Sequence, residues 1–135
     1  MSMENLRFRA WDKEDNKMVR WKDLRLVKNN RDKDLRVVDI TYSPIKFKKA
    51  KLMQSTGLKD KNGVEIYEGD IVEFKYPYDK RIKTKGTIVW NNNKACFGIN
   101  MKETTERYEL YRITAENYLT VIGDVHQTPN LLEDN

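Results

Sequence analysis

The segment from Met53 to Phe74 constrains the fold more than any other part of the chain, because it contains two sharp reversals close together. Asn62-Gly63 lies between short alternating runs, and this dipeptide is the strongest local indicator of a two-residue hairpin turn with positive φ at both positions. Gly69-Asp70 predicts a second reversal, directly before the β-branched run that begins at Ile71. Two close turns before a strand predict a small, strongly bent β-barrel.

The size and composition of the chain are those of a folded domain. A chain of 135 residues suits one compact domain, or a small domain with an appendage of similar size. A hydrophobic content of 39% beside 35% charged residues is polar for a globular protein. Three Trp, seven Tyr and four Phe nevertheless supply large side chains to bury, too many for a disordered chain. We therefore expect a folded, soluble protein.

Several classes of protein are disfavoured by what the sequence lacks. Cys96 is the single cysteine, so an intramolecular disulfide and a cysteine-based zinc cluster are both excluded. No apolar run approaches the roughly 18 residues that a membrane-spanning helix needs. The stretch from Met1 to Ala10 lacks the apolar core of a signal peptide. We expect a cytoplasmic protein with no membrane partner.

The charges are unevenly distributed along the chain. Residues 1–50 contain 14 Lys and Arg against 8 Asp and Glu, a net charge of +6. Residues 51–90 have a net charge of +2, and residues 91–135 have a net charge of −3. A basic front and an acidic back are compatible with nucleic-acid binding, with head-to-tail self-association, or with ordinary solubility.

Alternating apolar and polar residues predict strands along most of the chain, and no long window shows a helical period. The predicted strands are Leu6–Trp11, Met18–Trp21, Leu35–Tyr42, Ile71–Tyr76, Thr84–Trp90, Ala95–Met101 and Leu119–Ile122. Tyr108–Ile113 is open between a strand and a helical turn, and Leu131-Leu132 predicts a short helical turn. The expected fold is mostly β with little helix. It has an N-terminal basic β part at 1–50 and an SH3-like, partly open barrel at 51–135, with an oligonucleotide-binding barrel as the alternative.

Three blocks of sequence resemble a known family. They are Phe8-Arg9-Ala10-Trp11-Asp12 with Lys17-Met18, the long run from Met53 to Val72, and Val121-Ile122-Gly123-Asp124 with Pro129-Asn130-Leu131-Leu132. These blocks are similar to the YopX family of bacteriophage and prophage proteins. The resemblance implies a mostly β fold with an SH3-type C-terminal part and a phage-encoded, cytoplasmic origin. It implies no activity, so no functional residue is transferred from it.

One possible catalytic group consists of Cys96 as nucleophile, His126 as base and Asp124 as the residue that orients the base. Cys96 lies in the middle of a predicted strand, whereas nucleophiles usually occupy strained loops or the starts of helices. We therefore favour a packing role for Cys96 and a surface position for His126.

A group of carboxylates in the central segment is a possible metal site, made of Glu65, Glu68, Asp70 and Glu73. The positions of a calcium-binding loop are absent, and nearby lysines neutralise the charge, so a solvated face is the favoured interpretation. With no phosphate-binding loop and one His and one Cys, we expect no enzyme, no cofactor and no small-molecule substrate.

The basic run of Lys46, Lys48, Lys49 and Lys51 is the candidate nucleic-acid site. Alternation places Lys46 and Lys48 on one strand face, with Phe47 expected to pack inward. The favoured alternative is an edge strand that lysines protect from pairing with other chains.

We expect a non-enzymatic, phage-encoded accessory protein that binds another protein, with nucleic-acid binding by the basic N-terminal half as the alternative. Self-association is a further prediction, slightly favoured over packing of the front on the barrel. The first fifty residues contain several aromatic side chains, yet few strands in which to bury them, namely Phe8, Trp11, Trp21, Tyr42 and Phe47.

Overall fold

The computed structural model describes residues 6–75, 83–104 and 106–133, and within these ranges the chain is mostly β. The elements in order are β1 (Phe8–Asp12), β2 (Lys17–Val19), η2 (Trp21–Asp23), β3 (Leu26–Val27), β4 (Arg36–Asp39), β5 (Lys46–Lys48), β6 (Ala50–Lys59), β7 (Glu65–Tyr67), β8 (Asp70–Lys75), β9 (Lys83–Asn91), β10 (Cys96–Met101), β11 (Arg107–Glu109), α1 (Arg112–Tyr118), β12 (Leu119–Asp124) and η3 (Pro129–Leu132). The predicted mostly β fold with little helix is confirmed.

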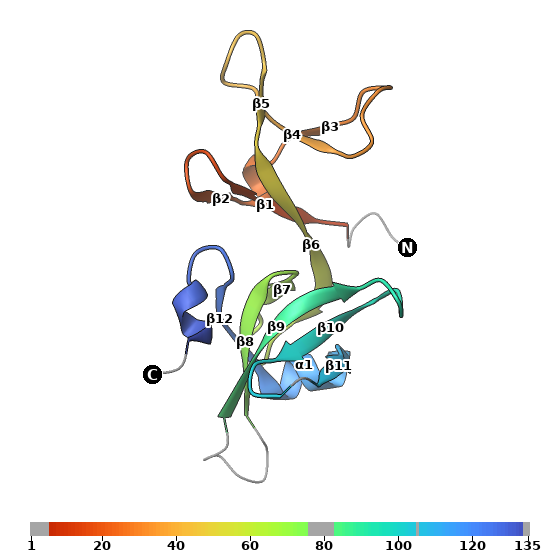
Figure 1. The fold of residues 1–135 in the computed structure, drawn as a ribbon, viewed down its shortest axis with the longest axis vertical. Helices are drawn as coiled ribbons and strands as arrows, with labels where there is room; N and C mark the ends of the chain where they lie inside the picture. Colours follow the sequence, from red (N-terminus) through yellow and green to blue (C-terminus); the bar gives the residue numbers. More distant parts are fainter. Residues whose placement is uncertain (1–5, 76–82, 105, 134–135) are drawn as a thin grey trace.

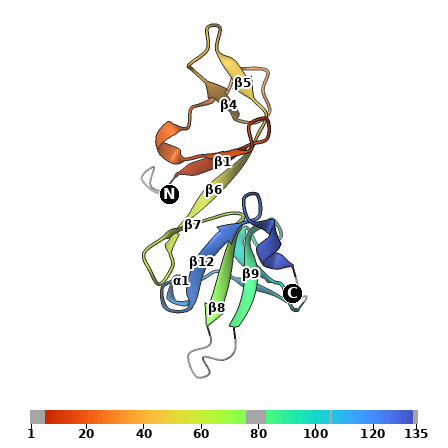
Figure 2. The same cartoon turned by 90° about the vertical axis from the view of Figure 1, so that its left-hand side faces the viewer.

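The strands form three sheets, with orders β2-β1-β6-β7, β11-β10-β9-β8-β12 and β3-β4-β5. The five-stranded sheet curls into a half-barrel at one end of the molecule, and the three-stranded sheet lies at the other end (Figures 1 and 2). The four-stranded sheet lies between them, and its long strand β6 pairs with β1 through residues 50–54 and with β7 through Ser55 and Lys59. We call residues 6–50 the front part and residues 51–133 the barrel part. The domain division at residue 50 stays a prediction, since β6 begins there and serves both parts.

Buried aspartates end two of the strands. The Oδ1 of Asp12, at the end of β1, accepts hydrogen bonds from the N–H groups of Glu14 and Asp15 at 3.0 and 3.2 Å. The Oδ1 of Asp124, at the end of β12, accepts hydrogen bonds in the same way from residues 126 and 127, both at 2.9 Å. A carboxylate that satisfies backbone N–H groups two and three residues later stabilises a turn locally. The chain therefore reverses immediately after each aspartate.

The hairpin between β6 and β7 is confirmed, but its predicted turn geometry is wrong at Asn62. Gly63 has φ +81° and donates its N–H to the carbonyl of Asp60 at 3.0 Å, which makes Lys61 and Asn62 the central residues. Asn62 is absent from the residues with positive φ. The reason is Asp60, whose Oδ1 accepts the N–H groups of Asn62 and Val64, both at 2.9 Å. The second reversal, at Gly69 with φ +89°, is confirmed.

The local assignments differ from the predicted strands at Trp21, and they resolve one ambiguous region. Trp21 belongs to the short helix η2 rather than to a strand. The open region near Tyr108 resolves into strand β11 followed by helix α1, whose seven residues are too few to show a period in the sequence. The predicted helical turn after Pro129 is confirmed as η3.

The two parts have cores of different size. In the barrel part, Phe74, Met101 and other half-buried residues pack around a buried cluster of Ile66, Val72, Ile88, Ile99, Ala115 and Leu119. The buried cluster of the front part consists of Ala10, Leu24 and Val37. The barrel therefore has the larger apolar core, and the front part has more side chains at the surface.

Candidate functional site

The front part is joined to the barrel by a buried ion pair. Arg9 of β1 and Asp70 of β8 expose 4% and 2% of their side chains, and Nη2 of Arg9 lies 2.8 Å from Oδ1 of Asp70. The guanidinium also lies 4.8 Å from the centre of the Tyr67 ring. Burial raises the pKa of the Asp70 carboxyl above its ordinary value, against the attraction of Arg9. A second contact is the stack of Trp11 on His126, with ring centres 5.5 Å apart.

The candidate nucleic-acid lysines have different surroundings. Lys48 exposes 6% of its side chain, and its Nζ lies 3.2 Å from Asp12, 3.1 Å from Asp15 and 3.8 Å from Asp39. The hydrogen bond to Asp15 and the nearby Asp12 raise the pKa of the Lys48 amine well above its ordinary value, against its burial. Lys46 lies 3.3 Å from Glu14. Two of the four amines thus face carboxylates of the β1–β2 hairpin.

The surroundings of Phe47 and of the other two lysines complete the description of the basic run. Lys49 and Lys51 are exposed, on either side of the first residue of β6. Phe47 exposes 37% of its surface instead of packing inward, and the guanidinium of Arg36 lies 3.7 Å from the centre of its ring. Strand β5 is an edge strand of the three-stranded sheet, as the alternative interpretation of the run requires.

The residues of the possible catalytic group lie in different surroundings. Cys96 lines a hollow on β9–β11. His126 stacks on Trp11, and burial lowers the pKa of its imidazole. Asp124 accepts the N–H groups of the turn that follows it, and its Oδ2 accepts a hydrogen bond from the Gln127 side chain at 2.6 Å. The structure gives each of these residues a structural contact and does not bring Cys96 to the histidine.

The carboxylates of the central segment are also separated by their contacts. Glu65 lies 2.8 Å from Arg7 and accepts the Ser55 hydroxyl at 2.9 Å, while Asp70 faces Arg9. Among the described residues, no group of three or more His, Cys, Asp or Glu side chains is arranged to hold a metal ion. In the same ranges, no helix has the length and apolar character needed to span a bilayer.

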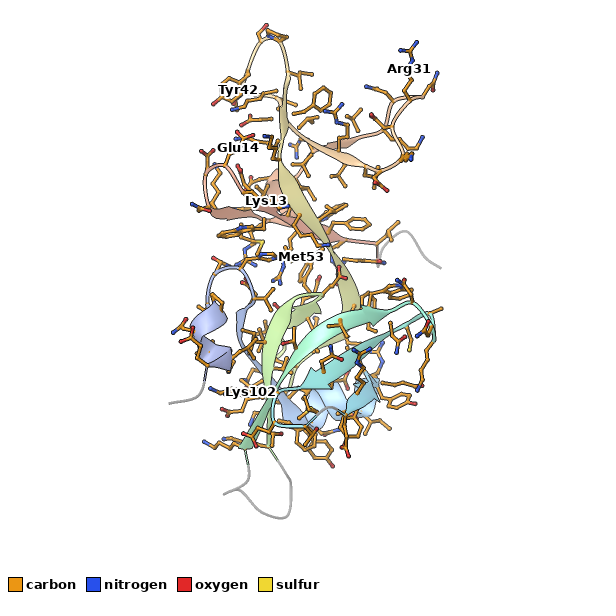
Figure 3. The ribbon with its side chains drawn as sticks, viewed as in Figure 1. Lys13, Glu14, Arg31, Tyr42, Met53 and Lys102 are labelled. Carbon is orange, nitrogen blue, oxygen red and sulfur yellow. The ribbon has the colours of Figure 1, made fainter. Side chains whose placement is uncertain are left out.

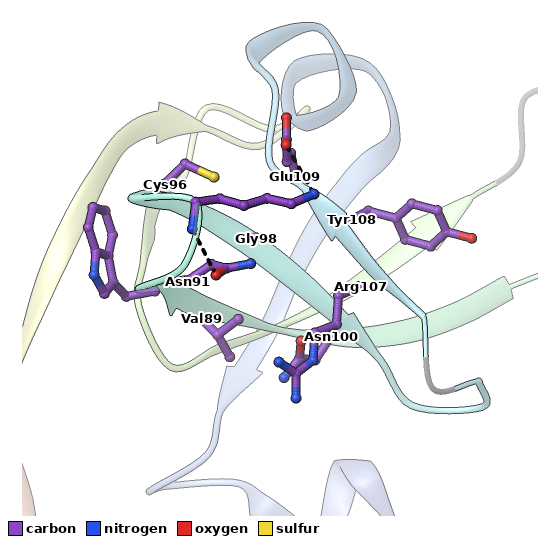
Figure 4. A pocket seen from close by; sticks show the side chains of 10 residues that line it. Val89, Asn91, Cys96, Gly98, Asn100, Arg107, Tyr108 and Glu109 are labelled. Carbon is purple, nitrogen blue, oxygen red and sulfur yellow. Dashed lines mark hydrogen bonds and ion pairs between the residues drawn. The ribbon is translucent and has the colours of Figure 1, made fainter.

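A small hollow of about 270 Å³ lies over Gly98 (Figure 4). Its lining combines apolar side chains such as Val89 and Trp90 with polar ones, among them the Lys94–Glu109 ion pair of 3.4 Å. Gly98 forms the floor of the hollow. Glycine is required at this position, because a Cβ there would lie 2.8 Å from the carbonyl oxygen of Tyr108. The buried Oδ1 of Asn100 has no hydrogen-bond partner in the structure. The hollow is therefore a small space formed where β10 and β11 approach each other closely, and not a large site.

A larger cavity, about 690 Å³, opens between β10, β11 and α1. Its floor consists of Phe74, Ile99 and Met101, which also belong to the barrel core or pack against it. Tyr108 and Tyr111 form its walls and expose 51% and 59% of their surfaces. We call these five residues the barrel mouth. Here the half-barrel leaves part of its apolar core open, in the range of volumes typical of binding pockets.

Charged side chains of both signs surround the barrel mouth. The lining includes Glu103, Glu106 and Glu109 together with two cations, Lys94 and Arg107. The Tyr108 hydroxyl donates to Glu106, and the Tyr111 hydroxyl donates to Glu109. The hydrogen bond from Tyr111 lowers the pKa of Glu109, and the same bond raises the pKa of Tyr111. The mouth is therefore apolar at its floor and has charged side chains of both signs at its rim.

The comparisons with known proteins agree with this fold. The model of the family described as YopX protein matches residues 7–133. The chain belongs to the YopX family. No curated protein sequence matches this YopX-family chain. Protein EF1440 from Enterococcus faecalis is similar in structure, with a TM-score of 0.67 and 23% identity over 95% of this chain and 98% of that one. Protein yopX from Bacillus subtilis has a TM-score of 0.67 and 24% identity over 97% and 98%.

The family and its structural neighbours give no sign of an enzymatic activity, and identities this low establish the fold alone. The barrel mouth was not predicted from the sequence. Tyr108 and Tyr111 lie in a segment whose sequence pattern is ambiguous, and exposed aromatic residues cannot be told from buried ones without the fold. The spacing of Glu103, Glu106 and Glu109 beside these tyrosines was the available clue.

Proposed function

We propose that this YopX-family protein is a phage- or prophage-encoded accessory protein of the cytoplasm that binds another protein without catalysis, through the barrel mouth. The supporting observation is an open apolar cavity of about 690 Å³ walled by half-exposed tyrosines. Tyrosine is enriched in protein interfaces, because it combines a large apolar surface with a polar hydroxyl. The family resemblance supports the phage origin.

Affinity capture from infected cells tests this proposal. The bait is the full chain, compared with a double variant, Tyr108→Ser with Tyr111→Ser. Both side chains are exposed, so the variant retains the barrel core, and an unchanged unfolding midpoint verifies this. Val64→Ser is the matched control, because Val64 exposes 47% of its surface away from the mouth. We expect proteins retained by the wild type and the control to be lost from the double variant. Equal retention by all three baits rejects the mouth as the binding surface.

Nucleic-acid binding by the front part is the second candidate, favoured by the net charge of +6 in residues 1–50. Lys49 and Lys51 are the exposed members of the basic run. Binding through phosphates predicts that oligonucleotide affinity falls steeply with added salt and falls again in Lys49→Gln with Lys51→Gln. Treating the capture with nuclease separates the two candidates, because it removes partners held through nucleic acid and leaves direct protein partners.

A further inference from the structure

Strand β11 is the last strand at one edge of the five-stranded sheet, and it borders the barrel mouth. The C=O of Glu106 and the N–H of Leu110 each bond to the main chain of β10, at 3.2 and 3.0 Å. Residues of an antiparallel strand alternately face their partner strand and face away from it. The N–H and C=O groups of Arg107 and Glu109 therefore point away from β10, along the outer edge of the sheet.

The opposite edge of the same sheet is already covered within the chain. There β12 is the outermost strand, and the residues that follow β6 lie against it. Leu119 accepts the N–H of Lys61 at 3.0 Å, and Val121 donates its N–H to Oδ2 of Asp60 at 2.9 Å. Among the described residues, no comparable bond reaches the outward main-chain groups of β11. The sheet is thus covered at one edge and open at the other.

The open edge has an apolar cavity on its inner side. Tyr108 lies directly opposite Ile99 in the β10–β11 ladder, so both side chains are on the face that lines the mouth. The front part lies at the other end of the molecule, and Figure 3 places Lys102, in the turn between β10 and β11, well away from Tyr42. A strand added beside β11 would therefore direct every second side chain toward the floor of the mouth.

We infer that the barrel mouth receives an extended segment of another protein, which pairs its main chain with β11 as an added strand. This inference rests on the proposed function, and it names the kind of segment that the mouth binds. The alternating N–H and C=O groups of the edge match an extended strand in partial charge and spacing, whereas a helix satisfies its own main chain. The apolar floor selects apolar residues at alternate positions of the segment. The charges of both signs at the rim select neither a basic nor an acidic segment.

Calorimetric titration of the full chain with a synthetic peptide tests the inference. The peptide is about seven residues long, with Val and Ile at alternate positions and Thr between them. The control peptide contains the same residues in an order without alternation. We expect the full chain to bind the control peptide at least about tenfold more weakly than the alternating peptide, because fewer apolar side chains then reach the mouth.

Arg107→Pro separates pairing of the main chain from contacts of the side chains. Proline removes the outward N–H of this position and is tolerated on an outer edge, because the ladder to β10 does not use that N–H. Arg107→Ala is the matched control, since it removes the same side chain and keeps the N–H. We expect Arg107→Pro to bind the alternating peptide at least about tenfold more weakly than Arg107→Ala does. Equal unfolding midpoints of the two variants verify that the ladder is intact.

Amide hydrogen exchange gives a test that needs no variant. The N–H groups of Arg107 and Glu109 are expected to exchange rapidly in the free protein, because no described residue accepts them, and slowly when the alternating peptide is bound. Unchanged exchange at both positions overturns the inference. The same conclusion follows if the alternating peptide binds no better than the control peptide, or binds equally to Arg107→Pro and Arg107→Ala.

The outcomes also separate this inference from the proposed function. Captured proteins that are lost from the variant Tyr108→Ser with Tyr111→Ser, but retained by Arg107→Pro, are held by side chains alone; the inference then fails and the proposed function stands. Equal retention by all of these baits rejects both. A wild-type mass of twice 16.1 kDa in light scattering, falling to 16.1 kDa in Arg107→Pro, shows that the edge pairs with a second copy and overturns the inference of a different protein.

Discussion

The front part and the barrel part use different interactions to bury their side chains. The barrel encloses six fully apolar residues in one cluster, from Ile66 to Leu119, whereas the front part buries three, Ala10, Leu24 and Val37. Both parts also bury charges: Lys48 of the front part faces three aspartates, one of them completely buried, and the barrel part buries Asp60, Asp70 and Asp124. The barrel adds to these a larger apolar core, while the front part, with its smaller core, depends more on paired charges and on its attachment to the barrel.

This difference has an energetic consequence. Burying apolar surface stabilises a fold by about 25 cal/mol per Å², and the contributions grow with the size of the core. A buried ion pair adds little net stability, because desolvation offsets the attraction, but removing one partner leaves an uncompensated charge. We therefore expect the front part to be sensitive to single changes of charge and the barrel part to changes of volume.

The largest effect is expected at the junction of the two parts. Arg9→Met keeps much of the side-chain volume but leaves the carboxylate of Asp70 buried without its cation. Loss of one partner of a buried pair costs about 3–5 kcal/mol of the free energy of unfolding. Urea denaturation measures it. The control is Arg7→Met, whose partner Glu65 is half-buried and whose loss is expected to cost about 1 kcal/mol or less. Equal effects of the two changes contradict the special role of the junction.

The next effect compares the two cores directly. Ile88→Ala removes three carbon atoms from a completely buried barrel site and is expected to cost about 2–5 kcal/mol. Val37→Ala removes two from the smaller front cluster and is expected to cost about 1–2 kcal/mol, because the site is nearer the surface. Chemical denaturation of both variants checks the order. A larger loss for Val37→Ala shows that the front part is the better packed of the two.

The positions of turns were well predicted from the sequence, because turn chemistry is local. Gly63 and Gly69 adopt positive φ close to where the sequence places the reversals. Buried polar residues were not predicted. Alternation along β1 places Arg9 opposite the apolar face, where an arginine is ordinarily solvated, yet the barrel covers that face and buries the guanidinium against Asp70. The residue that buries Arg9 lies about sixty positions away, and a local pattern contains no information about it.

The candidate sites also depend on contacts between residues far apart in the sequence, which local patterns do not predict. Composition identifies the basic run, but it does not show whether a given lysine faces solvent or a carboxylate. Lys48 lies among Asp12, Asp15 and Asp39 because β5 pairs with β4 and packs near the β1–β2 turn. The barrel mouth depends on which strands close the half-barrel, and strand order is not encoded in alternation. The sequence therefore predicts local elements better than the surfaces they form together.

A smaller effect is expected at the turn of the β6–β7 hairpin. Gly63→Val is expected to reduce the free energy of unfolding by about 1 kcal/mol or more, because a β-branched residue is strained at positive φ. No atom lies within 4 Å of a Cβ at this position, so the effect is conformational and not a clash. Gly63→Asn is the control with a smaller loss, since the front part makes its own turn with Asn16 at φ +51°. An unchanged unfolding midpoint for Gly63→Val contradicts the turn assignment.

The smallest effect is a pH dependence shared by the turns of both parts. Burial alone raises the pKa of Asp12 and of Asp124, but backbone N–H donors lower both pKa values below the ordinary value, with Lys48 also acting on Asp12. A carboxyl whose folded pKa is depressed binds its proton less readily in the folded state. The stabilisation of the fold by such a carboxylate is therefore present above the pKa of the unfolded state, about 3.9. It is lost as the pH falls through the lower pKa of the folded state.

Denaturation at a series of pH values from about 7 to about 3 measures this contribution. Asp12→Asn and Asp124→Asn are each expected to be less stable than the wild type at neutral pH, and the difference is expected to shrink as the medium becomes acidic. Asn91 provides an uncharged match, because its Oδ1 accepts the N–H groups of residues 93 and 94 at 3.0 and 3.2 Å. Asn91→Ala is expected to lower the stability by the same amount at every pH. If the aspartate variants also differ from the wild type by a constant amount, the carboxylates stabilise their turns as neutral acceptors do, and their charge contributes nothing.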